Sequence, residues 1–207
     1  MSEESKSTKP DSVANEAEGE NQTPWTDPEY VARYEDYLRM LARTHLRPQY
    51  QAKIGASDIV QQTMLQAVRA SDQFRGESEP EYRGWLRQIL VRQMCHLDRD
   101  LHRDKRDVRR EQSMQAAVDG SSLRLEGLLA GGDATPSQHV AGRESVARLA
   151  KAIAGLPDAQ RDAIELHYLQ GLKLTEVAEQ LGKTTGAIAG LLHRGMKQLR
   201  AEVQKSD

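Results

Sequence analysis

The sequence predicts an all-α protein of two small helical domains joined by a flexible linker, and three observations support this. Apolar residues recur at the 3.6-residue spacing of amphipathic helices along most of the chain, and no segment alternates as a strand does. Only 4% of the 207 residues are aromatic, which disfavours a large β-sandwich. A stretch rich in Gly, Ser and Pro separates two helical blocks. We therefore expect domains at 25–110 and 143–207, with the linker at 111–142.

Residues 1–24 are predicted to form a disordered acidic tail. Six acidic and two basic residues give this segment a net charge of -4, and it contains almost nothing apolar. An acidic tail is usually only a solvated segment. The alternative is that it mimics nucleic acid and masks a basic face of the protein.

The first domain is predicted to contain three helices. The first begins at Pro28, a residue favoured at the first helical position, directly after the N-cap candidate Asp27. The second begins near Ser57, and the third runs from about residue 79 to residue 110. Each has an apolar face at helical spacing: Val31, Tyr34, Leu38, Leu41 and Ala42 in the first, Ile59, Val60, Thr63, Met64, Ala67 and Val68 in the second, and Tyr82, Trp85, Leu86, Ile89, Leu90, Met94 and Leu97 in the third.

A loop and a basic segment complete this domain. Residues 74–80 are a predicted loop, because Gly76, Ser78 and Pro80 interrupt the helical pattern. The far end of the third helix is basic, since residues 86–110 contain eight Arg or Lys and four Asp, a net charge of +4. The linker that follows is rich in turn residues and is interrupted at most by a short helix at about 123–129.

The second domain is predicted to contain four helices, and its last two match a helix-turn-helix. The helices lie at about 146–153, 157–171, 175–181 and 184–203, the last capped by Thr184. The small Ala178 allows two crossed helices to approach, Gly182 takes the bend between them, and Ile188 closes the core. Such a motif places its second helix in the major groove of DNA. The same pattern would also suit a helical hairpin that binds no DNA.

Several motifs then carry a resemblance to a known family. Residues 156–161 (Leu-Pro-Asp-Ala-Gln-Arg), 168–172 and 176–182 resemble region 4 of sigma factors. Residues 58–63 (Asp-Ile-Val-Gln-Gln-Thr) resemble the region 2.2 helix, and residues 74–76 with 82–86 resemble region 2.3. Two domains without region 1.1 or region 3 resemble the extracytoplasmic-function (ECF) branch of the sigma-70 family. The resemblance covers roughly residues 28–203.

The resemblance implies a surface for core RNA polymerase. Asp58, Gln61 and Gln62 would lie on the helix that docks against the coiled coil of the polymerase β′ clamp. Charged and amide groups suit such a face, because they set the register of a partner helix as well as its affinity. The same side chains would also suit an ordinary solvated face.

The resemblance also implies contacts with the -10 element of a promoter. The loop would hold a flipped base while a basic channel follows the single strand. The candidate residues are Phe74, Arg75, Gly76, Glu77, Ser78, Trp85, Arg99, Arg103 and Arg106. Trp85 fits the core equally well, and the arginines, which offer phosphate contacts, would also fit a solvated basic face.

The helix expected at the -35 element departs from the family pattern. A Lys and an Arg that the family commonly has are replaced here by Ala189 and Leu191, so bidentate base readout by Arg is lost at that point. Gly190 and Gly195 each cost about 1 kcal/mol relative to alanine, which suggests a close approach of the backbone to DNA or to a partner helix. The remaining candidates for -35 contacts are Lys183, Thr184, Thr185, His193, Arg194 and Lys197.

Other classes of function find little support. Cys95, His96 and His102 lack the spacing of a zinc site, and no phosphate loop or catalytic constellation is visible, so we expect no metal, no cofactor and no enzymatic activity. No stretch approaches the ~18 apolar residues of a membrane span and no secretory signal is present, so we expect a cytoplasmic protein without membrane insertion.

We therefore expect a sigma factor that binds core RNA polymerase, directs it to promoter DNA and aids promoter melting. Two alternatives stay open: a helix-turn-helix regulator that acts without polymerase, and a sigma-like decoy that binds polymerase or an inhibitor but reads DNA poorly. A regulator would have no use for a base-capturing loop. An anti-sigma factor is a further possible partner by resemblance alone.

Overall fold

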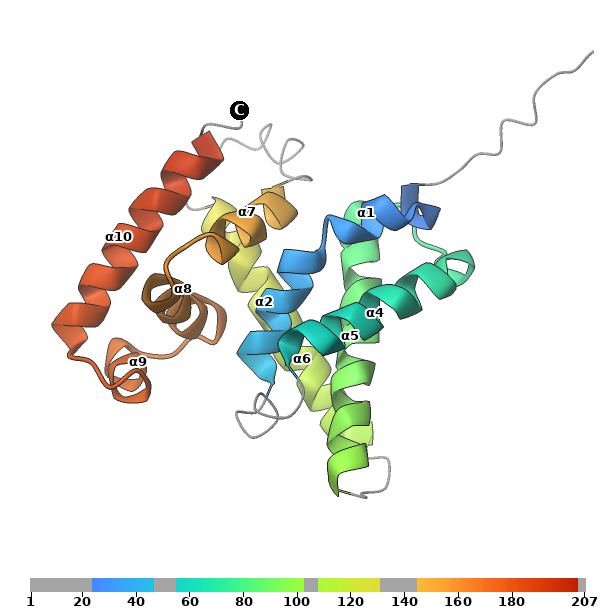
Figure 1. The fold of residues 1–207 in the computed structure, drawn as a ribbon, viewed down its shortest axis with the longest axis horizontal. Helices are drawn as coiled ribbons and strands as arrows, with labels where there is room; N and C mark the ends of the chain where they lie inside the picture. The colour runs from blue at the N-terminus through green and yellow to red at the C-terminus, as the bar shows by residue number, and fades with distance from the viewer. Residues whose placement is uncertain (1–23, 47–54, 103–107, 131–144, 205–207) are drawn as a thin grey trace, which may run out of the picture.

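The computed structural model describes residues 24–46, 55–102, 108–130 and 145–204, and every element in them is helical (Figure 1). The all-α prediction is therefore confirmed for the described part of the chain. The elements are η1 (Pro24–Thr26), α1 (Pro28–Ala32), α2 (Glu35–His45), α4 (Ala56–Arg69), η2 (Ser71–Gln73), α5 (Glu79–His102), α6 (Val108–Ala130), α7 (Ser145–Ala154), α8 (Asp158–Ile164), η5 (Glu165–Leu169), α9 (Leu174–Gln180) and α10 (Thr185–Gln204).

The first half is a bundle built on α2, α4, α5 and α6. Asp27 caps α1 as predicted, because its carboxylate accepts a hydrogen bond of 2.8 Å from the Glu29 N–H. The predicted first helix is divided, since α1 ends at Ala32 and α2 begins at Glu35. Most residues of the predicted faces nevertheless point inward: Val31, Tyr34, Leu38, Leu41, Ile59, Val60, Tyr82, Leu86 and Leu90 are all buried. The prediction is wrong for Val68, which lies in the last turn of α4 and is 37% exposed.

The second half contains α7 to α10, and the helix-turn-helix forms as predicted. Val177, Ala178 and Ile188 are buried between α9 and α10. Gly182 adopts φ of +62°, a conformation that favours glycine, so the chain can reverse between the two helices. Thr184 caps α10 by accepting a hydrogen bond of 3.2 Å from the Ala187 N–H.

The segment expected as linker differs from the prediction. Residues 108–130 form α6, where only a short helix at 123–129 was expected, and the predicted third helix ends at His102 instead of Arg110. The reason is tertiary packing. Ser121 and Ser122, which looked like linker residues, are buried, and Ser122 Oγ lies 2.9 Å from Tyr37 Oη in α2. Arg87 of α5 also binds Asp119 of α6 through Nε and Oδ1 at 2.5 Å.

The two halves meet where α2 and α6 pack against α7 and η5, and we call the polar part of this contact, formed by α2, α6 and η5, the joint. Two donors of α6 bind the Leu169 carbonyl: Ser121 Oγ at 2.7 Å and Arg124 Nε at 2.8 Å. Gln170 donates to the Thr44 carbonyl at 2.9 Å. In addition, Arg43 of α2 forms an ion pair with the buried Glu165 of η5. Burial raises the pKa of the Glu165 carboxyl, against the opposing effect of the Arg43 charge.

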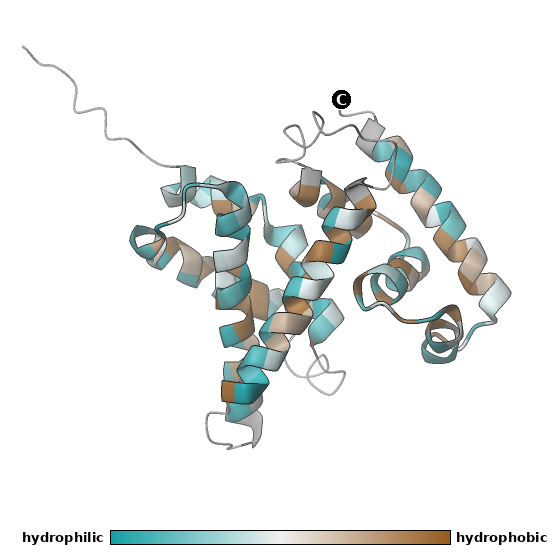
Figure 2. Cartoon of the chain, turned by 180° about the vertical axis from the view of Figure 1, so that it is seen from behind, coloured by the Kyte–Doolittle hydropathy of each residue, from teal (hydrophilic) through white to brown (hydrophobic). Residues whose placement is uncertain are grey.

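Hydropathy follows this architecture. Figure 2 shows hydrophobic residues mainly where helices face one another and hydrophilic residues on the outward surfaces. No helix among the described residues has the length and apolar character that would let it cross a membrane. The predicted acidic tail, apart from Pro24, and linker residues 131–142 lie outside the described residues, as do Arg103 and Arg106. The division into separate domains stays a prediction.

Candidate nucleic-acid and polymerase surfaces

The segment between η2 and α5 forms a compact loop, residues 74–78, on the surface of the first half. Glu81, in the first turn of α5, accepts hydrogen bonds from the backbone N–H of Glu77 at 2.8 Å and of Ser78 at 3.1 Å. The bond from Glu77, and with it the bonds from Ser78, lower the pKa of the Glu81 carboxyl. The carboxylate therefore fixes the end of the loop at the start of the helix.

The other end of the loop is fixed by an aromatic side chain. A Cβ at Gly76 would fall 2.8 Å from Phe74 Cε2, so the Gly76 backbone lies directly against the Phe74 ring. Arg75 is exposed, and its guanidinium donates to the carbonyl of Asp72. The loop is thus held from both sides while Arg75 and Glu77 remain exposed to solvent.

Beneath the loop lies a cluster of aromatic rings from η1, α1, the residue that caps α2, the loop and α5. Tyr82 is fully buried at its centre, and the Phe74 centroid lies 5.3 Å from Tyr82 and 5.4 Å from Trp85. Trp85 is half-buried, so it belongs both to the core and to the surface near the loop. The other members of the cluster are Trp25, Tyr30 and Tyr34. Such edge and tilted contacts are the arrangements that aromatic rings prefer.

The predicted polymerase residues lie together on one face of α4. Asp58, Gln61 and Gln62 are exposed, whereas the intervening Ile59 and Val60 are buried. Asp58 also accepts a hydrogen bond of 3.1 Å from the Gly55 N–H, so it contributes to the start of the helix. The face continues at helical spacing to Leu65, which is 44% exposed, and then to Gln66 and Arg69.

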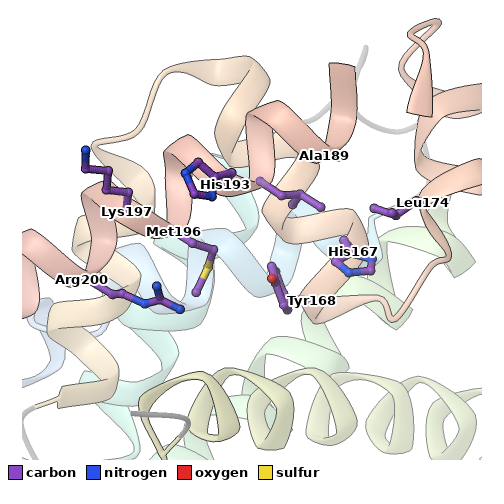
Figure 3. Close-up of a pocket in the computed structure, with 9 residues that line it drawn as sticks. His167, Tyr168, Leu174, Ala189, His193, Met196, Lys197 and Arg200 are labelled. Atoms are coloured by element: carbon purple, nitrogen blue, oxygen red, sulfur yellow. The ribbon is translucent and has the colours of Figure 1, made fainter. Parts of the chain in front are cut away.

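The predicted -35 residues occupy three places on the helix-turn-helix. Lys183, Thr184 and Thr185 are exposed at the start of α10. His193 and Lys197 line a groove of about 400 Å³ between α10, α9 and η5 (Figure 3). Its other lining residues are His167, Tyr168, Leu174, Ala189, Leu192, Met196 and Arg200. Arg194 lies away from this groove, with its guanidinium beside Gly190.

The two glycines of α10 have different surroundings. A Cβ at Gly195 would lie 2.7 Å from Ile164 Cδ1 in α8, so α10 approaches its neighbour closely there. At Gly190 a Cβ would meet only Arg194, with Nη1 at 3.2 Å. The expected close approach to a partner helix is therefore found at Gly195.

Of the -10 arginines predicted at the far end of the third helix, Arg99 is the one that lies within the described residues, near the end of α5. It lines a cavity of about 310 Å³ with Arg92, Gln93, His96 and Glu111. Within the described residues, no three His, Cys, Asp or Glu side chains gather in a way that could hold a metal ion.

Comparison with known proteins decides the family. Residues 147–199 match the family described as Sigma-70, region 4. The chain is 32% identical over 171 residues to the RNA polymerase sigma factor CnrH of Cupriavidus metallidurans, and the match covers 83% of each chain. This chain belongs to the ECF branch of the sigma-70 family. It is also 26% identical to the ECF sigma factor SigW of Bacillus subtilis, over 83% of this chain and 82% of that one.

The solved structure of CnrH in complex with the cytosolic domain of CnrY is 25% identical to this sigma factor. That match covers 86% of this chain and 88% of the other, with a TM-score of 0.32.

Three features of this sigma factor were not predicted from its sequence. Glu81 fixes the loop, Trp25 packs against it, and Leu65 lies within the polar face of α4. Glu81 could have been found, because a carboxylate three residues into a helix that follows a loop is a common capping arrangement. The contact of Trp25 with Phe74 could not have been found in this way, because the sequence around Trp25 does not indicate which side chain it packs against.

Proposed function

We propose that this sigma factor binds core RNA polymerase, directs it to promoters and helps to open the -10 element. The exposed face of α4 binds the polymerase, the loop at residues 74–78 captures an unpaired base, and the helix-turn-helix contacts the -35 element. An anti-sigma factor stays a prediction of the family resemblance.

The main observation behind this proposal is that the loop at residues 74–78 is held in one conformation by its neighbours. Glu81 holds two backbone N–H groups, and the Phe74 ring supports the backbone of Gly76. A loop that is already ordered loses little conformational freedom when it binds a splayed base. Arg75 lies exposed within it and can approach a phosphate of the single strand. Phe74 is half-buried, so its part in this proposal is to support the loop from below.

The exposed face of α4 supports the proposed polymerase binding because it combines polar side chains with an exposed apolar one. Asp58, Gln61 and Gln62 provide polar groups that set the register of a partner helix. Leu65, exposed between them and Arg69, provides apolar surface that a partner can bury. We therefore add Leu65 to the residues expected at this interface.

The helix-turn-helix offers few side chains for base readout. Thr185 is exposed at the start of α10, and the exposed Ala187 and Ala189 that follow provide no hydrogen-bonding side chain. Lys183 and Arg194 supply positive charge, which favours phosphate contacts that position the helix without specifying sequence. This domain therefore contributes more to placement on DNA than to base discrimination.

Transcription in vitro tests the proposal. Core RNA polymerase is supplied with a library of genomic fragments, with and without this protein, and new start sites are mapped. We expect discrete new starts that share -10 and -35 patterns. Stable polymerase binding without new starts would favour the decoy, and promoter binding without any polymerase binding would favour the plain regulator.

Opening of the -10 element is tested by a variant of the loop. On a promoter found in that assay, we expect Glu81→Ala to reduce the rate of strand opening by about three- to tenfold, because two charge-assisted hydrogen bonds are lost. Permanganate reactivity of unpaired thymines measures the opening. Gln88→Ala is the matched control, since Gln88 is exposed further along the same helix. Equal opening by both variants would contradict the role given to the loop.

A further inference from the structure

Trp25 lies outside the segment that resembles the family, yet it packs against the base-capturing loop. It belongs to η1, which the Asp27 N–H closes by donating to the Pro24 carbonyl at 3.2 Å. The Trp25 and Phe74 centroids are 5.5 Å apart, with the ring planes at 70°. Trp25 also lies 5.2 Å from Tyr82 and 5.4 Å from Tyr30.

These contacts connect Trp25 to the loop backbone through one ring. Phe74 has Trp25 as an edge-on neighbour, and the Gly76 backbone also rests against it, where a Cβ would overlap it. Without the indole, Phe74 would lose one of the rings that hold it beneath Gly76. Glu81 would then remain as the main restraint on the loop.

We propose that Trp25 is a positioning residue that holds the loop at residues 74–78 in the conformation that accepts an unpaired -10 base. This inference rests on the proposed function of the loop. Trp25 acts through Phe74 and contacts no DNA itself. Since η1 lies against η2, the residues just before Phe74 are also supported by the segment that carries Trp25.

The first test measures the loop directly. Hydrogen exchange of full-length Trp25→Ala is compared with wild type, and we expect faster exchange at the Glu77 and Ser78 N–H groups, by about tenfold, as expected for the loss of aromatic pair contacts. Trp25→Phe keeps a ring against Phe74 and should restore slow exchange. Val31→Ala is the matched control, because Val31 is buried in the adjacent α1 but does not belong to the aromatic cluster. Unchanged exchange in Trp25→Ala would overturn the inference.

The second test measures capture of the single strand. Holoenzyme is titrated with a fluorescent single-stranded oligonucleotide that carries the nontemplate -10 sequence of a mapped promoter. We expect about tenfold weaker binding with Trp25→Ala, near wild-type binding with Trp25→Phe and Val31→Ala, and unchanged affinity for core polymerase. If Trp25→Ala and Val31→Ala weakened oligonucleotide binding equally, the effect would come from a general loss of stability, and the inference would be overturned.

Glu81→Ala separates the two possible failures. If Glu81→Ala weakens capture and Trp25→Ala does not, the inference about Trp25 is wrong and the proposed function stands. If neither variant changes capture, the loop does not receive the base, and the proposed function itself is wrong.

Discussion

Two buried tyrosines of the first half show that the contribution of a buried hydroxyl group to stability depends on its hydrogen-bond partners. Tyr37 and Tyr82 are both fully buried. Tyr37 Oη lies 2.9 Å from Ser122 Oγ and accepts a hydrogen bond of 3.1 Å from Arg87 Nη1. Tyr82 Oη has no hydrogen-bond partner among the described residues. Burial raises the pKa of Tyr82, so its hydroxyl stays neutral and brings only a desolvation cost.

We therefore expect opposite effects from the same substitution at these two positions. Tyr82→Phe should raise the free energy of unfolding by about 1 kcal/mol, because it removes an unsatisfied buried hydroxyl and keeps the ring. Tyr37→Phe should lower it by about 1–2 kcal/mol, because Ser122 and Arg87 each lose one of their hydrogen-bond partners in a buried place. Urea unfolding followed by circular dichroism measures both. A loss of stability in Tyr82→Phe equal to that in Tyr37→Phe would be contrary to this account.

At the scale of the helices, the close contact between α8 and α10 depends on Gly195. Gly195→Ala improves helix propensity by about 1 kcal/mol, but its Cβ would meet the Cδ1 of Ile164, a fully buried side chain with little room to move. We expect a net loss of about 1 kcal/mol in thermal or urea unfolding. Gly190→Ala is the control, because only the long Arg194 side chain would have to shift, and it should stabilise by about 0.5–1 kcal/mol. Stabilisation by both substitutions would show that α10 tolerates a side chain at this contact.

The helices also show what the sequence could and could not predict. Asp27, Thr184 and Gly182 were predicted correctly, because caps and turns depend on a few neighbouring residues. Most of α6 was missed, because its Gly and Ser residues have weak helix propensity and its burial depends on partners far along the chain. For the candidate site, the position of the loop was predictable, but its support by Trp25 was not, since that contact is tertiary.

At the scale of the whole molecule, the joint contains an unusual histidine. His45 Nε2 lies 3.0 Å from Ser121 Oγ, and the Ser121 hydroxyl proton is donated to the Leu169 carbonyl, so the imidazole is the donor to Ser121. Burial, with a smaller effect of the Arg124 charge, lowers the pKa of His45 to about 4. The folded state therefore holds a neutral imidazole at a pH where the unfolded chain already binds a proton.

This shift predicts a loss of stability in acid. The contribution of His45 is fully present above its unfolded pKa of about 6.5 and is lost as the pH falls toward 4, by about 3 kcal/mol at most. Urea unfolding at pH 7, 6, 5 and 4 measures it. His45→Gln should show a flatter dependence than wild type. Glu165 titrates in both proteins, so its opposite contribution cancels in the difference. Parallel curves for the two proteins would exclude His45 as the source.

The joint also has a consequence for any ligand that needs the two halves further apart. The Arg43–Glu165 pair and the two bonds to the Leu169 carbonyl would have to break before such a ligand could bind. Its apparent affinity is then its intrinsic affinity multiplied by the fraction of molecules in which the halves are separated. A substitution that weakens the joint would increase that fraction and tighten binding, even though the altered residue never contacts the ligand.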